Sequence, residues 1–150
     1  MENKMFCFQC EQTAGCTGCT GKAGVCGKSA DVANLQDELT GALIGLARAT
    51  DGDTPVSADT WLLLIEGLFT TVTNVNFNEK TIRELIDRVH AEKARLIPNC
   101  SACASRCGRN DDYNMAELWN AQEDVRSLKS LILFGVRGMA AYAHHALVLG

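Results

Sequence analysis

The chain has 150 residues, 47% of them hydrophobic and 21% charged, so it can bury a core without disulfide staples. Its net charge of −4 argues against nonspecific nucleic-acid binding, which needs an excess of Lys and Arg to displace phosphate counterions. The first residues contain no apolar stretch typical of a signal peptide, and Arg137, His144 and His145 interrupt the most apolar segment, residues 131–150. We therefore expect a cytoplasmic protein with no membrane span, whose eight cysteines are kept reduced.

Residues 1–28 are predicted to form a cluster-binding loop, because residues 6–28 are rich in Cys, Gly and Thr and lack helical or strand periodicity. Residues 29–98 are predicted to form a three-helix bundle. The three helices would begin at Ser29, Ser57 and Asn78, which are good N-cap residues, and Pro98 would end the third. Apolar residues recur at three- and four-residue spacings along each helix; in the first they are Val32, Leu35, Leu39, Leu43 and Leu46.

The second half of the chain is predicted to contain a connecting loop, residues 99–122, and a long helix, residues 123–150. This last helix carries apolar residues on more than one face, so it should have neighbours on more than one side. We expect it to belong to a second bundle that this chain does not complete. No run of alternating apolar residues is long enough for a sheet, which makes the predicted fold class all-α.

The cysteines of the N-terminal loop have spacings that suit a metal centre. Cys7 and Cys10 are separated by two residues, and Cys19 and Cys26 follow at wider spacing. Zinc sites usually combine two tight cysteine pairs, whereas a larger iron–sulfur cluster can be held by one irregular loop. The spacing favours an iron–sulfur cluster, with zinc and disulfides or free thiols as alternatives. Cys16 is either a bystander or a substitute for Cys19 as a ligand.

The residues between these cysteines also suit an anionic centre. Several glycines of the loop allow positive φ angles and bring backbone N–H groups close to sulfur atoms. Together with Lys22 and Lys28, such donors would offset the negative charge of a cluster and help to set its reduction potential.

Other candidate sites are weaker. Cys100, Cys103 and Cys107 are one thiol short of a closed tetrahedral site, and nothing in the spacing requires His90 as the fourth ligand. A reduced surface loop or a redox-active pair is therefore the favoured interpretation. Adjacent helical residues point about 100° apart, so the neighbouring histidines near the C-terminus are expected to pack rather than to bind one ion. The large aromatic residues expected in the core are Trp61, Trp119 and Phe134.

Seven segments spread over nearly the whole chain resemble one family. They are residues 6–13, 18–20, 24–28, 32–37, 73–77, 123–129 and 138–143, which read FCFQCEQT, GCT, GVCGK, VANLQD, TNVNF, EDVRSLK and GMAAYA. Together they are similar to the N-terminal part of hybrid-cluster proteins, also called hydroxylamine reductases. This match is far more specific than an isolated Cys-x2-Cys pair.

The resemblance implies that Cys7, Cys10, Cys19 and Cys26 bind a [4Fe–4S] cluster, although six residues separate the last two cysteines here and five do in the family pattern. It also implies that this chain corresponds to the α-helical first domain alone. Complete members have two further α/β domains, which hold a hybrid iron–sulfur–oxygen cluster through a His, carboxylates and cysteines. By itself the chain would lack this reducing centre and would not be catalytic.

The leading functional hypothesis is an electron-transfer domain. It would receive electrons from a reductase or a ferredoxin-like donor and pass them to the hybrid cluster, where the complete enzyme reduces hydroxylamine to ammonia or nitric oxide to nitrous oxide. Its further partners would be the remaining domains or a second copy of the chain. The alternatives are a non-catalytic structural module that binds zinc or a cluster, and a redox sensor that responds by losing its cluster.

Overall fold

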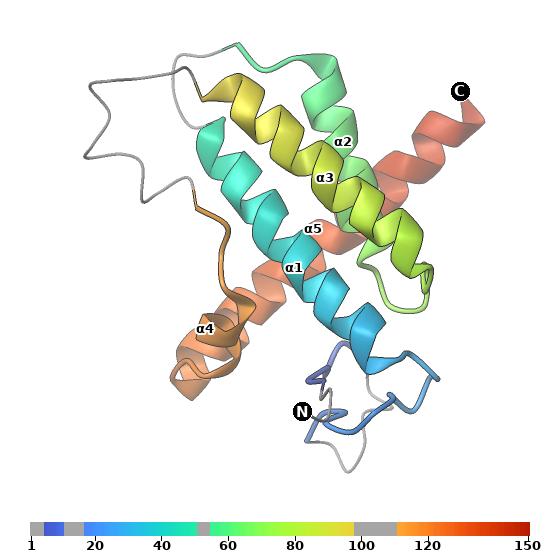
Figure 1. The fold of residues 1–150 in the computed structure, drawn as a ribbon, viewed down its shortest axis with the longest axis vertical. Helices are drawn as coiled ribbons and strands as arrows, with labels where there is room; N and C mark the ends of the chain where they lie inside the picture. The colour runs from blue at the N-terminus through green and yellow to red at the C-terminus, as the bar shows by residue number, and fades with distance from the viewer. Residues whose placement is uncertain (1–4, 11–16, 51–54, 98–110) are drawn as a thin grey trace.

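The structure, a computed structural model, describes residues 5–10, 17–50, 55–97 and 111–150 (Figure 1). Within these ranges the chain forms five helices and no strand of a sheet, which agrees with the predicted all-α class. The helices are α1 (Ala30–Ala49), α2 (Ala58–Thr70), α3 (Glu79–Leu96), α4 (Met115–Trp119) and α5 (Glu123–Leu149). Cys16 and the cysteines at 100, 103 and 107 lie outside the described residues, so their expected roles stay predictions.

Side-chain caps begin the first three helices at the predicted residues. Ser29, Ser57 and Asn78 each have extended backbone conformations and each accept a hydrogen bond from a backbone N–H in the first helical turn. These bonds satisfy donors that a helix start would otherwise leave unpaired. The predicted starts of α1, α2 and α3 are therefore confirmed.

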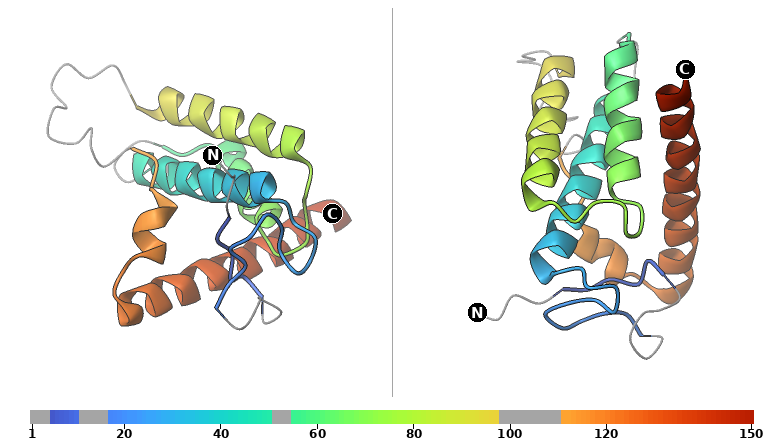
Figure 2. Two further views of the ribbon diagram at one scale, coloured as in Figure 1. Left: turned by 60° about the horizontal axis from the view of Figure 1, so that its bottom comes forward. Right: turned by 90° about the vertical axis from the view of Figure 1, so that its right-hand side faces the viewer.

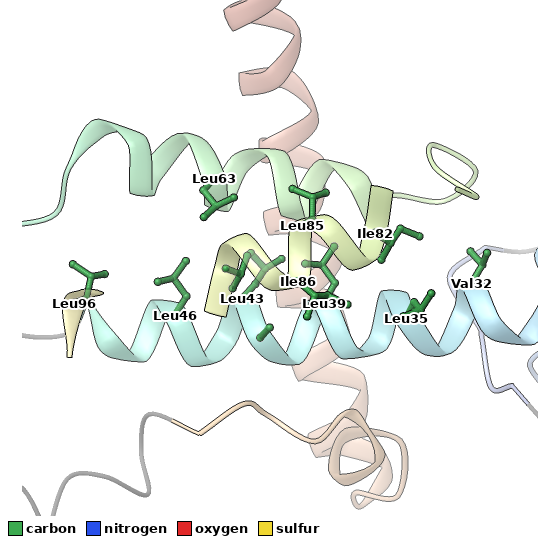
Figure 3. Packing of buried hydrophobic residues seen from close by; sticks show 12 residues of the cluster. Val32, Leu35, Leu39, Leu43, Leu46, Leu63, Ile82, Leu85, Ile86 and Leu96 are labelled. Atoms are coloured by element: carbon green, nitrogen blue, oxygen red, sulfur yellow. The ribbon is translucent and has the colours of Figure 1, made fainter. Parts of the chain in front are cut away.

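The main hydrophobic core lies between α1, α2 and α3 (Figure 3). Leu39 and Leu46 of α1 and Ile82 and Val89 of α3 have no exposed surface. Residues three and four positions apart on each helix supply these side chains, as an apolar stripe requires. Figure 1 shows α1 and α3 lying side by side along their lengths, with α2 behind them.

Two glycines of α1 let the segment before α4 lie directly against this helix. A Cβ added to Gly41 would overlap the backbone oxygen of Tyr113, and one added to Gly45 would be 2.8 Å from Oδ1 of Asp112. The N–H of Tyr113 donates a hydrogen bond to the carbonyl oxygen of Gly41 at 3.1 Å. The absence of side chains at both positions thus fixes how the chain enters α4.

Helix α5 crosses the bundle and packs mainly against α2 (Figures 1 and 2). Its buried residues are Ser130, Arg137 and Ala140. Much of its remaining apolar surface is open, and the residues that are more than 60% exposed are Leu128, Leu131, Ile132, Met139, Tyr142, Val148 and Leu149. By length and composition α5 is also the one helix in the described ranges that could cross a membrane. One such helix is weak evidence for a membrane span, because a core helix of a soluble protein passes the same test.

The predictions for the large aromatic residues had mixed outcomes. Trp61 is 53% exposed, so its assignment to the core is wrong. Helix α2 is apolar around most of its circumference, and α1, α3 and α5 leave the side that carries Trp61 uncovered. Trp119 and Phe134 are half-buried, and His144 stacks on Phe69 with ring centroids 4.1 Å apart.

Candidate metal centre

The N-terminal loop is organised by a short antiparallel pairing between two of the predicted ligands. The N–H of Cys7 donates to the carbonyl oxygen of Cys19 at 3.0 Å, and the N–H of Cys19 donates to that of Cys7 at 2.7 Å. Residues that exchange both backbone hydrogen bonds stand directly opposite each other, with their side chains on the same face. The pairing therefore directs both thiols to one side of the loop. Gly18, at φ +102°, precedes Cys19 in a conformation that favours glycine.

A tight turn brings the fourth cysteine back to the same place. The N–H of Gly24 donates to the carbonyl oxygen of Lys28 at 2.8 Å, and Gly27 has a φ of +84°. A Cβ on Gly24 would lie 3.6 Å from Sγ of Cys26 and 3.8 Å from Sγ of Cys19. The two sulfur atoms thus face one small volume beside a residue that has no side chain.

All four predicted ligands, Cys7, Cys10, Cys19 and Cys26, line one cavity. Cys19 is buried, the first two are half-buried and Cys26 is exposed, and none of them is in a disulfide. Within the described residues, no three His, Cys, Asp or Glu side chains converge closely enough to hold a single metal ion. The loop therefore gathers the expected cysteines, while their ligation of a metal stays a prediction.

The electrostatics of the cavity fit an anionic group. Lys28 lines the cavity and is only 1% exposed, and its Nζ donates to Oε1 of Gln36 at 2.6 Å. In the described part of the chain no carboxylate lies within salt-bridge distance of this ammonium. A buried charge is costly without a counter-charge. A centre with four thiolates would supply a negative charge directly beside Lys28.

Burial raises the pKa of the Cys7 thiol, while the backbone N–H of Gln9 and the charge of Lys28 act in the opposite direction. Without a metal this thiol would stay protonated at neutral pH. Metal binding would then displace its proton, as thiolate ligation requires.

Contacts on two sides attach the loop to the helices. The hydroxyl of Thr73, in the turn between α2 and α3, donates to the carbonyl oxygen of Gln9 at 3.2 Å. On the other side the ring of Phe8 lies edge-on to Trp119 of α4, with centroids 4.8 Å apart, and 5.9 Å from the ring of Phe134 of α5. The loop thus lies at the N-terminal end of α1, held by elements from both halves of the chain (Figure 2).

A buried polar network continues from the loop into the bundle. The indole N–H of Trp119 donates to Oδ2 of Asp37 at 3.1 Å. Arg137 of α5, 3% exposed, donates from Nε to Thr71 and from Nη2 to Thr40, both at 2.9 Å. Burial raises the pKa of Asp37 to about 6, although the hydrogen bond from Trp119 and the charges of Arg137 and Lys28 act in the opposite direction. Burial also lowers the pKa of Arg137 to about 10.

We expect Asp37→Asn to remove a pH dependence of stability between about pH 4 and pH 6. Because the pKa of Asp37 is about 6 in the folded chain and about 3.9 when unfolded, the folded chain binds more protons in this window. The stabilisation from protonated Asp37 is complete below about pH 4 and is lost as the pH rises through 6. The variant should therefore be more stable than the unaltered chain at pH 7, by on the order of 2 kcal/mol.

Urea denaturation of both proteins from pH 4.5 to 7.5 measures this difference. Asp87→Asn, on the exposed side of α3, is the control and should keep the original profile. If Asp37→Asn shows the same slope as the unaltered chain, the assignment of this titration to Asp37 is wrong.

Sequence reasoning identified the cysteines and Lys28 but missed Gln36, Asp37 and the partners of Arg137. A signal was present, because Gln36 and Thr40 are polar residues four positions apart within the apolar stripe of α1. The isolated charge of Arg137 in an apolar helix was a second signal. His90, considered as a ligand for the second cysteine group, has its Nε2 2.7 Å from Oδ2 of Asp112.

Comparisons with known proteins relate this chain to one family. The model of the Prismane/CO dehydrogenase family matches residues 5–150. Hydroxylamine reductases from Methanocella arvoryzae, Clostridium perfringens and Porphyromonas gingivalis (strain ATCC 33277) are 36%, 40% and 39% identical to this chain over 177, 167 and 170 residues. These alignments cover 97%, 97% and 100% of this chain but 31%, 30% and 30% of the relatives.

The fold and the cavity define a helical protein with four cysteines gathered at its N-terminal loop. The chain belongs to the Prismane/CO dehydrogenase family and is homologous to the N-terminal part of hydroxylamine reductases. It spans about 30% of the length of these relatives. The family binds iron–sulfur clusters, in agreement with the cluster chemistry that the cysteine spacing favours.

Proposed function

We propose that this chain is an iron–sulfur electron-transfer domain in which Cys7, Cys10, Cys19 and Cys26 hold a [4Fe–4S] cluster. The observation that carries the proposal is the single cavity lined by all four thiols next to the buried ammonium of Lys28. The cluster would supply reversible one-electron chemistry. The protein's part is to hold four thiolates, to shield three of them at least partly from water and to compensate their charge.

The spacing of the cysteines supports a cluster over zinc. Structural zinc sites usually combine two tight cysteine pairs. Among the four cysteines that share the cavity only Cys7 and Cys10 form such a pair, whereas one irregular loop can hold a larger cluster.

The exposure of the cysteines supports an entry point for electrons at Cys26. Cys26 is exposed and the adjacent Val25 is 60% exposed, whereas Cys19 is buried against Ala30 and Ala33. Among the four cysteines Cys26 is the most exposed, so a donor could approach the cluster most closely from its side. We propose that a reductase or a ferredoxin-like protein docks there.

The length of the relatives supports a role within a larger enzyme. The relatives named above are hydroxylamine reductases, and this chain spans only about 30% of them. We propose that the domain passes electrons to a hybrid iron–sulfur–oxygen cluster held by the remaining domains. The complete enzyme would reduce hydroxylamine to ammonia or nitric oxide to nitrous oxide in the cytoplasm.

The exposed face of α5 supports contact with those remaining domains, as part of a second helical bundle. Contiguous apolar surface of this kind marks an interaction site in soluble proteins. In the isolated 150-residue chain this face has no cover, so we expect the chain to self-associate. Light scattering should show dimers or larger species, and Leu131→Lys combined with Met139→Lys should yield monomers. An unaltered chain that is monomeric at all concentrations would contradict this prediction.

Reductive titration of the anaerobically purified chain tests the electron-transfer proposal. A bound cluster should lose visible absorbance on one-electron reduction and regain it on reoxidation. A colourless protein, or one whose spectrum a strong reductant does not change, would leave a structural metal module and overturn the proposal.

A further inference from the structure

Lys28 is a buried cation beside the proposed cluster ligands. It lines the same cavity as the four cysteines and is two residues from Cys26. It is also 1% exposed, so bulk water and salt screen it weakly.

Two neutral contacts fix the position of this ammonium. Nζ of Lys28 donates to Oε1 of Gln36 at 2.6 Å and lies 5.8 Å from the centroid of the Phe77 ring. Gln36 has no exposed surface, and its Nε2 donates to the carbonyl oxygen of Asn76 at 2.9 Å. Because Oε1 and Nε2 of the amide are both engaged, the orientation of Gln36 is set. The amide therefore positions the lysine without neutralising its charge.

A fixed positive charge at this place has a defined effect on a redox centre. Reduction adds one electron, and so one negative charge, to a cluster that is already anionic. A nearby cation stabilises the reduced form more than the oxidised form, and in a water-excluded site the effect is large. Lys22 is exposed on the same loop, where solvent and salt weaken the effect of its charge.

We propose that Lys28, held by Gln36, is a positioning residue that raises the reduction potential of the cluster. The inference rests on the proposed function, because it requires a cluster on the four cysteines. It assigns the tuning to one buried lysine rather than to the loop glycines or to surface charge. This role also accounts for a neutral side chain at Gln36, because a carboxylate at that position would cancel the charge of Lys28.

A redox titration with one-electron dyes on the anaerobically purified chain tests the proposal. Lys28→Met should lower the ratio of reduced to oxidised cluster at a fixed potential by about tenfold, which is 59 mV for a one-electron couple. Lys22→Met is the matched control and should change the ratio by less than about twofold.

Gln36→Glu provides a second test that keeps Lys28 and the size of the side chain at position 36, while it removes the hydrogen bond to the carbonyl oxygen of Asn76. The new carboxylate would pair with the ammonium, so the ratio of reduced to oxidised cluster should again fall, by about threefold or more. If Lys28→Met loses its cluster, the potential of Gln36→Glu alone tests the effect of the Lys28 charge. Potentials that neither Lys28→Met nor Gln36→Glu shifts would overturn this inference alone, whereas an unaltered chain with no reduction wave would overturn the proposed function as well.

Discussion

Cys19→Ser is expected to remove most of the cluster from the chain. Cys19 is the most deeply buried of the four cavity cysteines and is paired through its backbone with Cys7. A serine of nearly the same size would preserve this pairing but would replace a soft thiolate with a poor ligand for iron. We expect bound iron to fall by about tenfold or more, measured as iron and sulfide per chain after anaerobic purification.

Cys16→Ser is the matched control for this prediction, because it changes the neighbouring cysteine of the same loop in the same way. It should retain iron and sulfide at the level of the unaltered chain. If Cys16→Ser loses the cluster and Cys19→Ser keeps it, the third ligand has been assigned to the wrong cysteine.

Gly41→Ala is expected to destabilise the fold by about 2 kcal/mol or more, although alanine is the better helix former. The added methyl group would overlap the backbone oxygen of Tyr113, which cannot rotate away as a side chain could. The segment before α4 would have to move off α1 and would lose the hydrogen bond from Tyr113 N–H to Gly41. The free energy of unfolding in urea measures the effect.

Gly138→Ala is the matched control, because it makes the same change in the interior of another helix. Apart from its chain neighbours and the nearby backbone of its own helix, no atom lies within 4 Å of the position that its Cβ would occupy. The change should therefore stabilise the chain by up to about 1 kcal/mol through helix propensity alone. Equal effects of the two substitutions would contradict the close packing at Gly41.

Local chemistry made the helices predictable from the sequence. Ser29, Ser57 and Asn78 are caps whose effect depends on the next three residues alone, and the apolar stripes of α1 and α3 follow from helical geometry. The exposure of Trp61 could not be predicted in this way, because it depends on which sides of α2 the other helices cover.

The gathering of the four cysteines was predictable from the sequence, but the residues that surround them were not. Short spacing in a glycine-rich loop indicated that the four cysteines belong together, and the loop does bring them to one cavity. The contacts of Lys28 with Gln36 and of Trp119 with Asp37 join residues 8 and 82 positions apart. Their pairing depends on how the loop, α1 and α4 meet in three dimensions, which no local pattern specifies.

Metal analysis of the anaerobically purified chain tests directly whether the four cysteines hold a cluster. Iron, acid-labile sulfide and zinc should be measured per chain on the same sample. We expect about four irons and four sulfides with little zinc, as a [4Fe–4S] cluster on four thiolates requires. One zinc per chain with no sulfide would contradict it and would leave the four cysteines as a structural zinc site.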